Sequence, residues 1–262
     1  MKIFVFADLH YFIGDPTKFK FSKTQKLVQY ALPIMDKIDE HLKNDGNYAF
    51  SVNLGDLIQD VEDKELDLKA LTDIKERLDA FCCPCYTIFG NHDLKMMDSV
   101  SELEELFSTK SAYSFDQEGY HFVFISPEIR CELGIERGGC YKAQYISQKN
   151  VEWLRKDLEA NTLPCVIFTH YALAEDETLT DELNFVKNRD EIKSIIRNDK
   201  NVLGVFSGHT HVNNRIVEDG IEYYIIASLT GCPLENGIPD GSYFVIELEN
   251  GKMNVTLDSI RV

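Results

Sequence analysis

Residues 2–10 read Lys-Ile-Phe-Val-Phe-Ala-Asp-Leu-His, so a short apolar run passes directly into an acidic residue and a histidine. The run Ile3–Phe6 is rich in β-branched and aromatic residues, which is typical of a strand that is covered on both faces. Asp8 and His10 follow this strand at once. The stretch therefore combines a buried strand with polar side chains at its carboxyl end, and the same combination recurs along the chain.

Four later strands are predicted to end in the same way. Their polar residues are Asp56 after Phe50–Leu54, Asn91, His92 and Asp93 after Cys85–Phe89, His170 after Val166–Phe168, and His209 and His211 after Val202–Phe206. Because the carboxyl ends of parallel strands gather at one crevice in an open α/β sheet, we expect these side chains to meet. Imidazole, carboxylate and amide oxygen together are typical ligands of divalent transition metals.

Segments of helical periodicity separate these strands. Apolar residues at three- and four-residue steps predict helices around residues 27–42, 71–81, 151–158 and 192–196. Pro33 is expected to kink or interrupt the first helix, and Ser147 is a candidate N-cap of the third. The remaining histidines, His41 and His121, fall in a helix and a strand, and we interpret both as structural.

A further strand is predicted at residues 122–125. The C-terminal third is predicted to be mainly strand, because after Phe206 strand-like runs at 215–217, 223–227, 243–248 and 253–257 follow one another closely. Turns such as Asp219-Gly220 and Asn250-Gly251 separate them, which favours antiparallel pairing. The chain shows no internal repeat or linker, so we expect an α/β fold in a single domain over residues 1–262.

The charge of the chain limits its partners. Lys and Arg total 27 against 44 Asp and Glu, a net charge of −17, which disfavours nucleic acid and anionic membranes. Small phosphorylated substrates remain candidates, because bound cations can reverse the local field. The seven cysteines lack the spacing of a disulfide framework, and no apolar run is long enough for a signal sequence or a membrane span. We expect a cytoplasmic protein; the sequence does not indicate its oligomeric state.

The ordered set Asp-x-His, Gly-Asp, Gly-Asn-His-Asp, a lone His and Gly-His-x-His, spread over residues 8–211, resembles the calcineurin-like metallophosphoesterase superfamily. The resemblance implies a sandwich of two mixed β-sheets flanked by helices, with two metals at one edge. Carried over, it assigns Asp8, His10, Asp56 and His211 to one metal, and Asp56, Asn91, His170 and His209 to the other. Asp56 would bridge, since one carboxylate can give an oxygen to each metal.

The sequence departs from the motifs of two branches of the superfamily, and these differences bear on which branch it resembles. Its protein serine/threonine phosphatases carry an Arg shortly after Gly-Asp and a Glu after Gly-Asn-His, whereas here residues 57–60 read Leu-Ile-Gln-Asp and Asp93 takes the later place. The chain is more similar to the small bacterial-type members, which include cyclic-nucleotide and glycerophosphodiester phosphodiesterases. Those often continue the His170 motif with a second His and prolines, where this chain has Tyr171-Ala172-Leu173.

A mechanism follows as a hypothesis. Two divalent ions of manganese, iron, zinc or cobalt would lower the pKa of a shared water and polarise the phosphoryl oxygens, and the resulting hydroxide would attack phosphorus. His92 is placed to donate a proton to the leaving group. Asp93 is predicted to orient His92 by a hydrogen bond. The glycines before the predicted ligands, Gly55, Gly90 and Gly208, are expected to serve positive φ or close backbone approach.

Three functions remain open. The favoured one is hydrolysis of a phosphodiester or phosphomonoester bond in a small organic phosphate, and the second is a pyrophosphatase acting on nucleotide-diphosphate compounds. A non-catalytic scaffold that binds a protein partner is disfavoured, because all seven ligands and His92 are present. The long connections 11–23, 128–145 and 171–188 are expected to form the substrate rim. Their candidate phosphate-binding cations are Arg130, Arg137, Lys142 and Arg189.

Overall fold

The predicted sandwich of two mixed sheets is present in a computed structural model, which describes residues 1–15, 26–129, 144–179, 181–232 and 236–262. The first sheet has the order β13-β12-β1-β2-β3, in which β1 pairs in parallel with β2 and antiparallel with β12. Its strands are β1 (Lys2–Phe6), β2 (Phe50–Asn53), β3 (Cys85–Thr87), β12 (Ser242–Glu249) and β13 (Lys252–Ser259).

The second sheet has the order β10-β11-β9-β8-β5-β4, with β5, β8, β9 and β11 mutually parallel along the sheet. Its strands are β4 (Ala112–Gln117), β5 (Tyr120–Ile125), β8 (Cys165–Thr169), β9 (Val202–Ser207), β10 (Asn214–Glu218) and β11 (Ile221–Ile225). A short pair, β6 (Glu128–Ile129) and β7 (Gln144–Tyr145), follows β5. Sequence patterning did not identify β4, whose residues are only partly buried.

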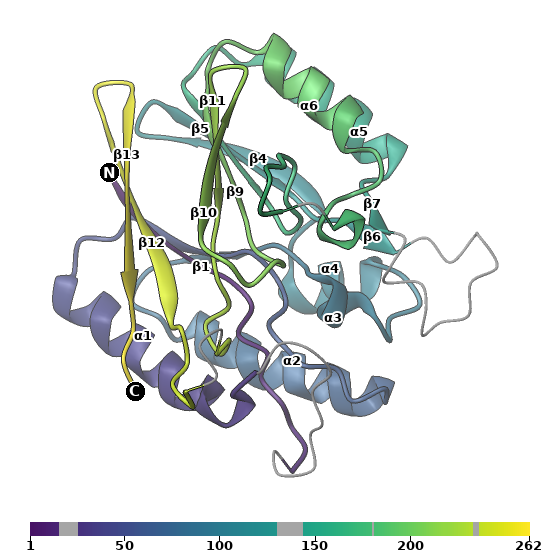
Figure 1. Ribbon diagram of the computed structural model, residues 1–262, viewed down its shortest axis with the longest axis vertical. Coiled ribbons are helices and arrows are strands. Elements are labelled where there is room, and N and C mark those ends of the chain that lie inside the picture. Colours follow the sequence, from purple (N-terminus) through teal and green to yellow (C-terminus); the bar gives the residue numbers. More distant parts are fainter. Residues whose placement is uncertain (16–25, 130–143, 180, 233–235) are drawn as a thin grey trace.

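Helices cover the outer faces of the two sheets (Figure 1). The apolar sides of α1 and α2 pack on the first sheet, and those of α5 and α6 pack on the second. The helical segments are η2 (Val28–Tyr30), α1 (Ala31–Asp45), α2 (Lys64–Asp79), α3 (Asn91–Leu94), α4 (Ser101–Phe107), α5 (Gln148–Ala160), η5 (Glu182–Asn184) and α6 (Arg189–Asn198). The arrangement is a four-layer stack of helices, sheet, sheet and helices.

Two helix signals in the sequence had different outcomes. Ser147 is the N-cap of α5, and its side chain accepts a hydrogen bond from the backbone N–H of Asn150 at 3.3 Å, as predicted. The prediction that Pro33 kinks or interrupts a helix was wrong. Because α1 begins at Ala31, Pro33 lies in the first turn, where a backbone N–H has no partner within the helix and proline is tolerated.

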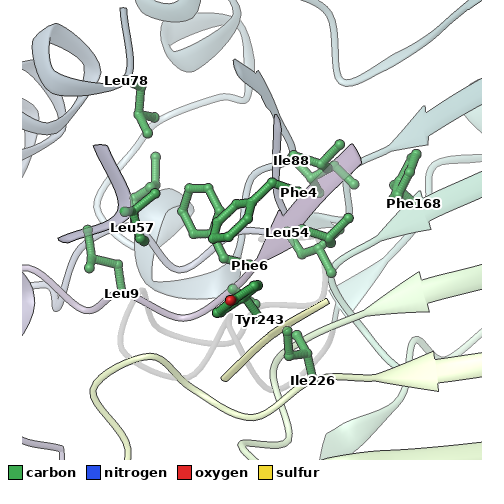
Figure 2. Close-up of a cluster of buried hydrophobic side chains, with 14 of the residues drawn as sticks. Phe4, Phe6, Leu9, Leu54, Leu57, Leu78, Ile88, Phe168, Ile226 and Tyr243 are labelled. Atoms are coloured by element: carbon green, nitrogen blue, oxygen red, sulfur yellow. The ribbon is translucent and has the colours of Figure 1, made fainter. Parts of the chain in front are cut away.

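Aromatic rings fill the space between the sheets. Ring centroids of Phe168 and Phe206, on neighbouring strands of the second sheet, are 5.7 Å apart, and Phe206 is 5.9 Å from Phe244 of β12 in the first sheet. Figure 2 shows part of the same buried cluster, in which Phe4 of β1 and Tyr243 of β12 have centroids 4.6 Å apart and lie on the other face of the first sheet, against His41 of α1. The packing of Phe206 on Phe244 fixes one sheet against the other, and with it the strand ends that meet at their common edge.

His121 occupies a structural site far along β5 from the predicted ligands. The side chain is buried, with Nδ1 2.6 Å from Asp116 Oδ1 and Nε2 2.9 Å from Asp157 Oδ2. Burial disfavours the charged imidazolium, but the hydrogen bonds to Asp157 and Asp116 outweigh it and raise the pKa of His121. The same contact with His121 lowers the pKa of Asp116.

We predict that His121→Gln destabilises the protein more at pH 5.5 than at pH 9. A raised pKa in the folded state contributes stability that is complete below the unfolded value, about 6.5, and is lost as the pH rises through the folded value. The difference between the two pH values should be on the order of 1 kcal/mol in the free energy of unfolding, measured by urea denaturation. An equal effect of the substitution at both pH values would show that the imidazole is not charged in the fold.

Candidate active site

The carboxyl ends of five parallel strands bring the predicted ligands together. Asp8, His10 and His211 place their ligand atoms within 4.8 Å of one another, and so do Asp56, His170 and His209. Asn91 joins the second group, with its Oδ1 3.2 Å from Nε2 of His170. His92 is also near, because its Nε2 is 3.9 Å from Asp56 Oδ2. All the residues predicted to bind metal therefore converge at one edge of the sandwich, in two groups.

The backbone of these loops is unusual. Five of the predicted ligands have positive φ angles: Asp8 (57°), His10 (49°), Asp56 (53°), His209 (66°) and His211 (58°). A left-handed conformation costs a residue with a Cβ about 1–2 kcal/mol, so the surrounding structure must enforce it. Hydrogen bonds between loops do so here: the N–H of Asp8 donates to the carbonyl of Gly55 at 3.0 Å, and that of His10 to Asp56 at 3.0 Å.

The glycines before the ligands act in the two ways that the sequence suggested. Gly55 adopts a φ of +101°, which favours glycine. At Gly90 the need is space, since a Cβ there would lie under 3.0 Å from Asp56 Oδ1 and from Cε1 of His170. The ligand loops approach one another so closely that a methyl group would separate them.

The first group contains a buried carboxylate oxygen that lacks a donor. Asp8 is completely buried; its Oδ2 accepts the backbone N–H of His209 at 2.9 Å, and its Oδ1 has no hydrogen-bond partner among the described residues. Nε2 of His211 lies 3.2 Å from this Oδ1 and 3.0 Å from Nε2 of His10. Burial raises the pKa of Asp8 to about 6. A cation between these atoms would supply the charge that the carboxylate lacks.

In the second group, backbone carbonyls fix the imidazole tautomers. Nδ1 of His170 is 2.7 Å from the carbonyl oxygen of Leu54, so Nδ1 carries the hydrogen and the lone pair of Nε2 faces Asn91 Oδ1 and Asp56 Oδ1, at 3.2 and 3.5 Å. Nε2 of His209 is 3.0 Å from the carbonyl of Leu183. The lone pair of His209 is then on Nδ1, which is buried without a hydrogen-bond partner in the described structure.

This donor chemistry fits divalent cations. Lone pairs of imidazole, carboxylate and amide oxygen face one another, and the far nitrogens of His170 and His209 are held by carbonyls, as is usual for metal-binding histidines. Burial is the first cause that lowers the pKa values of His10, His170, His209 and His211. Neutral imidazoles are the form that binds metal. Asp56 offers its two oxygens to different groups, Oδ1 toward His170 and Oδ2 toward His10.

The prediction that Asp93 orients His92 was wrong. Nδ1 of His92 is 2.5 Å from Asp60 Oδ2, and Asp60 Oδ1 also accepts a hydrogen bond from Lys95 at 2.7 Å. Burial opposes the charge on Asp60, but the hydrogen bonds from His92 and Lys95 outweigh it and lower its pKa. Asp93 instead accepts the backbone N–H groups of Gly90 at 2.8 Å and Ile58 at 3.2 Å.

Asp93 turns away from His92 because it lies in the first turn of helix α3. Gly90 is the N-cap of α3, so Asp93 stands at the third helical position, where an acidic side chain turns back to the N-cap backbone. The sequence did contain a signal for the true partner. Gln59-Asp60 lies just beyond Asp56, the predicted bridging ligand, and a carboxylate so close to a predicted ligand is a natural candidate for the partner of His92.

Lys26 is a second residue that the sequence analysis missed. Its side chain is 9% exposed, and its Nζ lies 2.9 Å from Gln59 Oε1, 3.3 Å from His10 Nδ1 and 3.3 Å from His92 Nε2. Burial lowers the pKa of Lys26 to about 8, while Asp56 and Asp8 act in the opposite direction. No sequence pattern distinguishes Lys26 from the other lysines of residues 18–26.

Of the long connections predicted to form the substrate rim, residues 171–188 are seen to contact the site. The carbonyl of Leu183, in the connection 171–188, contacts His209, so this loop does border the site. Arg189 points to the acidic part of that loop, pairing with Glu175 at 2.9 Å and Glu182 at 3.0 Å. Arg130, Arg137 and Lys142 lie outside the described residues, as does most of the connection 128–145 and residues 16–23 of the first connection.

The profile of the calcineurin-like phosphoesterase family matches residues 1–213. The chain belongs to the calcineurin-like phosphoesterases. It is therefore a metal-dependent hydrolase of phosphoester bonds. No helix in the described parts of this phosphoesterase has the length and apolar character that crossing a membrane requires.

Known proteins similar to this phosphoesterase include a manganese-dependent ADP-ribose/CDP-alcohol diphosphatase of Oryza sativa subsp. japonica. It is 22% identical over 271 residues, which cover 87% of this chain and 83% of the relative. A dimetal phosphatase from Danio rerio has a similar structure, with a TM-score of 0.79, 15% identity and coverage of 98% and 96% of the two chains. GAP50, the anchor in the inner membrane complex of Plasmodium, has a TM-score of 0.58, 13% identity and coverage of 99% and 84%.

The revised partner of His92 leads to a matched pair of variants. Asp60→Asn should lower turnover by about 10- to 100-fold while metal content persists, because the group that orients His92 is lost. Asp93→Asn should lower the free energy of unfolding by about 1–3 kcal/mol, because an amide cannot accept both backbone N–H groups. Steady-state kinetics, metal analysis and urea denaturation of both variants check this, and the reverse pattern would restore Asp93 as the partner.

The close approach at Gly90 predicts that Gly90→Ala weakens metal uptake. The added methyl group would push Asp56 and His170 apart, so divalent-cation affinity should fall by about 10- to 100-fold, measured by titration calorimetry on metal-stripped protein. Gly220→Ala is the matched control, because a Cβ there meets nothing within 4 Å although φ is +82°. The control should lose stability and keep its metal affinity; equal metal affinity in both variants would contradict the argument.

Proposed function

We propose that this phosphoesterase binds two divalent cations through the seven predicted ligands and hydrolyses small organic phosphates. One cation would be held by Asp8, His10, Asp56 and His211, and the other by Asp56, Asn91, His170 and His209. The observation that carries the proposal is the pair of converging lone-pair clusters. Asp8 Oδ1 in one cluster and His209 Nδ1 in the other are buried without a hydrogen-bond partner in the described structure. Manganese is the first ion to test, since the rice relative is manganese-dependent.

Two such ions, when bound, lower the pKa of water and polarise phosphoryl oxygens. The chain itself supplies the proton for the leaving group. Nε2 of His92 is the exposed end of an imidazole whose Nδ1 is held by Asp60, so the ring is fixed with Nε2 toward Asp56 and the metal groups. The side chain of His92 is 20% exposed, whereas those of His10 and His170 are fully buried, so a substrate can reach it. His92 is therefore the proposed general acid.

The substrate class is proposed to be small. A net charge of −17 opposes polyanionic partners, and the described site is a cluster at the edge of the sandwich. Within this class a phosphodiester or a phosphomonoester is the first candidate. A phosphoanhydride in a nucleotide-diphosphate compound is the second candidate. It is supported by the rice relative, an ADP-ribose/CDP-alcohol diphosphatase of which 83% of the length aligns with this chain.

One experiment separates these candidates. Metal-stripped protein is loaded in turn with manganese, iron, zinc and cobalt, and each form is assayed on panels of phosphomonoesters, phosphodiesters and pyrophosphate-linked nucleotides. We expect hydrolysis of one class with at least one metal. Absence of hydrolysis with every metal that is shown to bind would favour a non-catalytic scaffold.

His92→Ala tests the proposed general acid. Its loss should lower kcat by about 10²- to 10⁴-fold with both metals retained, because the imidazole of His92 is not among the seven proposed ligands. Metal analysis accompanies the kinetics. If His92→Ala loses its metals, or keeps full activity on a substrate with a poor leaving group, the assignment is wrong.

A further inference from the structure

An ammonium group lies inside the active site, on the side of the proposed general acid. Nζ of Lys26 is 3.3 Å from Nε2 of His92, the nitrogen that would protonate the leaving group. The same Nζ is 2.9 Å from Gln59 Oε1 and 3.3 Å from Nδ1 of His10. The established activity of the family and the proposed ligands assign no role to this lysine.

The backbone holds Lys26 firmly in this position. Residue 26 forms an antiparallel bridge with Gly231, and the N–H of Leu27 donates to the carbonyl of Thr230 at 2.8 Å. Ser228, at the start of the same turn, donates its hydroxyl to the carbonyl of Asp8 at 2.7 Å. The lysine is therefore tied to the loop that carries a metal ligand, and it differs from a surface lysine whose ammonium group moves freely in water.

The hydrogen bonds of the ammonium group leave a place for a substrate. An ammonium has three N–H donors, and among the described residues that of Lys26 faces Gln59 Oε1 and two imidazole nitrogens. If His10 binds a cation through Nε2, the hydrogen of its neutral ring lies on Nδ1, which then cannot accept a bond from Lys26. When His92 acts as an acid, its Nε2 carries a hydrogen as well. Of these described neighbours only Gln59 then remains as an acceptor, so the other N–H groups can donate to an oxygen of the substrate.

We propose that Lys26 is a catalytic residue that binds the leaving-group oxygen of the substrate together with His92. This inference rests on the proposed function. Two donors 3.3 Å apart can both bond a single oxygen at ordinary hydrogen-bond distances, about 2.7–3.1 Å. Lys26 thereby discriminates among leaving groups, because a fixed cation favours an oxygen that carries negative charge as it departs.

The chemical step can be written in full. The oxygen of hydroxide forms a bond to phosphorus, the bond from phosphorus to the leaving oxygen breaks, and its electron pair stays on that oxygen. An alkoxide takes the proton of His92 Nε2. A leaving phosphate group, whose second pKa is about 6, can depart as an anion without that proton, and Lys26 neutralises part of its charge. The stabilisation from Lys26 acts on the charge of the departing oxygen in the transition state, so within a series of phenols it is greatest for the poorest leaving group, whose bond to phosphorus is the most broken there.

The alternative role for Lys26 is structural, namely to hold the shape of the site through its contacts with Gln59 and His10. The two roles predict opposite effects on metal binding. Without the ammonium group, a cation meets less repulsion beside His10 and Asp8. If Lys26 binds the substrate, its substitution should therefore tighten metal binding and slow turnover. If Lys26 only maintains the fold of the site, its substitution should weaken metal binding and slow turnover together.

The test uses Lys26→Met and Lys26→Gln in the full chain. Titration calorimetry measures Mn²⁺ binding to each metal-stripped variant, and kcat/KM is measured on a series of aryl phosphodiesters whose phenols differ in pKa. We expect tighter Mn²⁺ binding, a decrease in kcat/KM of about 10- to 100-fold for the poorest leaving group, and a smaller decrease for the best. Lys37→Met is the matched control, since Lys37 is an exposed lysine of α1 that pairs with Glu40. It should match the wild type in both measurements.

Each outcome decides one of the two proposals. A uniform loss of kcat/KM across the series in both variants, or weaker Mn²⁺ binding in both, overturns the role of Lys26 while the wild-type activity leaves the proposed function standing. A metal-loaded wild type that hydrolyses none of the esters overturns the proposed function, and the role of Lys26 with it.

Discussion

The structure depends on the burial of two carboxylates, Asp8 and Asp56, at the edge where its two sheets meet. Asp8 is completely inaccessible and Asp56 nearly so, and burial raises the pKa of each to about 6. Such groups are unfavourable in a protein interior unless positive charge or hydrogen-bond donors surround them. Here many of the surrounding atoms carry lone pairs, on imidazoles and an amide, so cations bound between them would stabilise the arrangement.

The rest of the architecture serves this arrangement. Parallel pairing of β1 with β2 sets Asp8 beside the loop of Asp56, and parallel pairing of β8 with β9 sets His170 beside the loop of His209. The aromatic layer between the sheets holds these two pairs in contact, as the ring distance between Phe206 and Phe244 shows. Left-handed backbone at five ligands and the absence of a Cβ at Gly90 then bring the side chains within reach. Local strain is accepted at the ligands because the sheet interior fixes their positions.

The sequence could predict what depends on strand ends. Each predicted ligand lies close to the carboxyl end of an apolar strand. Residues as distant as Asp8 and His211 meet because β1 and β9, in different sheets, end at the same edge of the sandwich. Prediction failed where side-chain direction within a loop decides the contact. Asp93 turns back to Gly90 because α3 begins there, which leaves Asp60 as the partner of His92. Lys26 is positioned by its antiparallel bridge to Gly231 and by the backbone hydrogen bond from Leu27 to Thr230, about two hundred residues away, and no local pattern encodes such contacts.

The most direct measurement is the number of divalent ions that the metal-stripped protein binds, together with the change in its thermal unfolding temperature. The account predicts two Mn²⁺ ions per chain and a marked rise in unfolding temperature, since ligand at about 100 times its dissociation constant adds about 2.7 kcal/mol of stability. Binding of no divalent ion, or uptake of ions without any stabilisation of the fold, would contradict it.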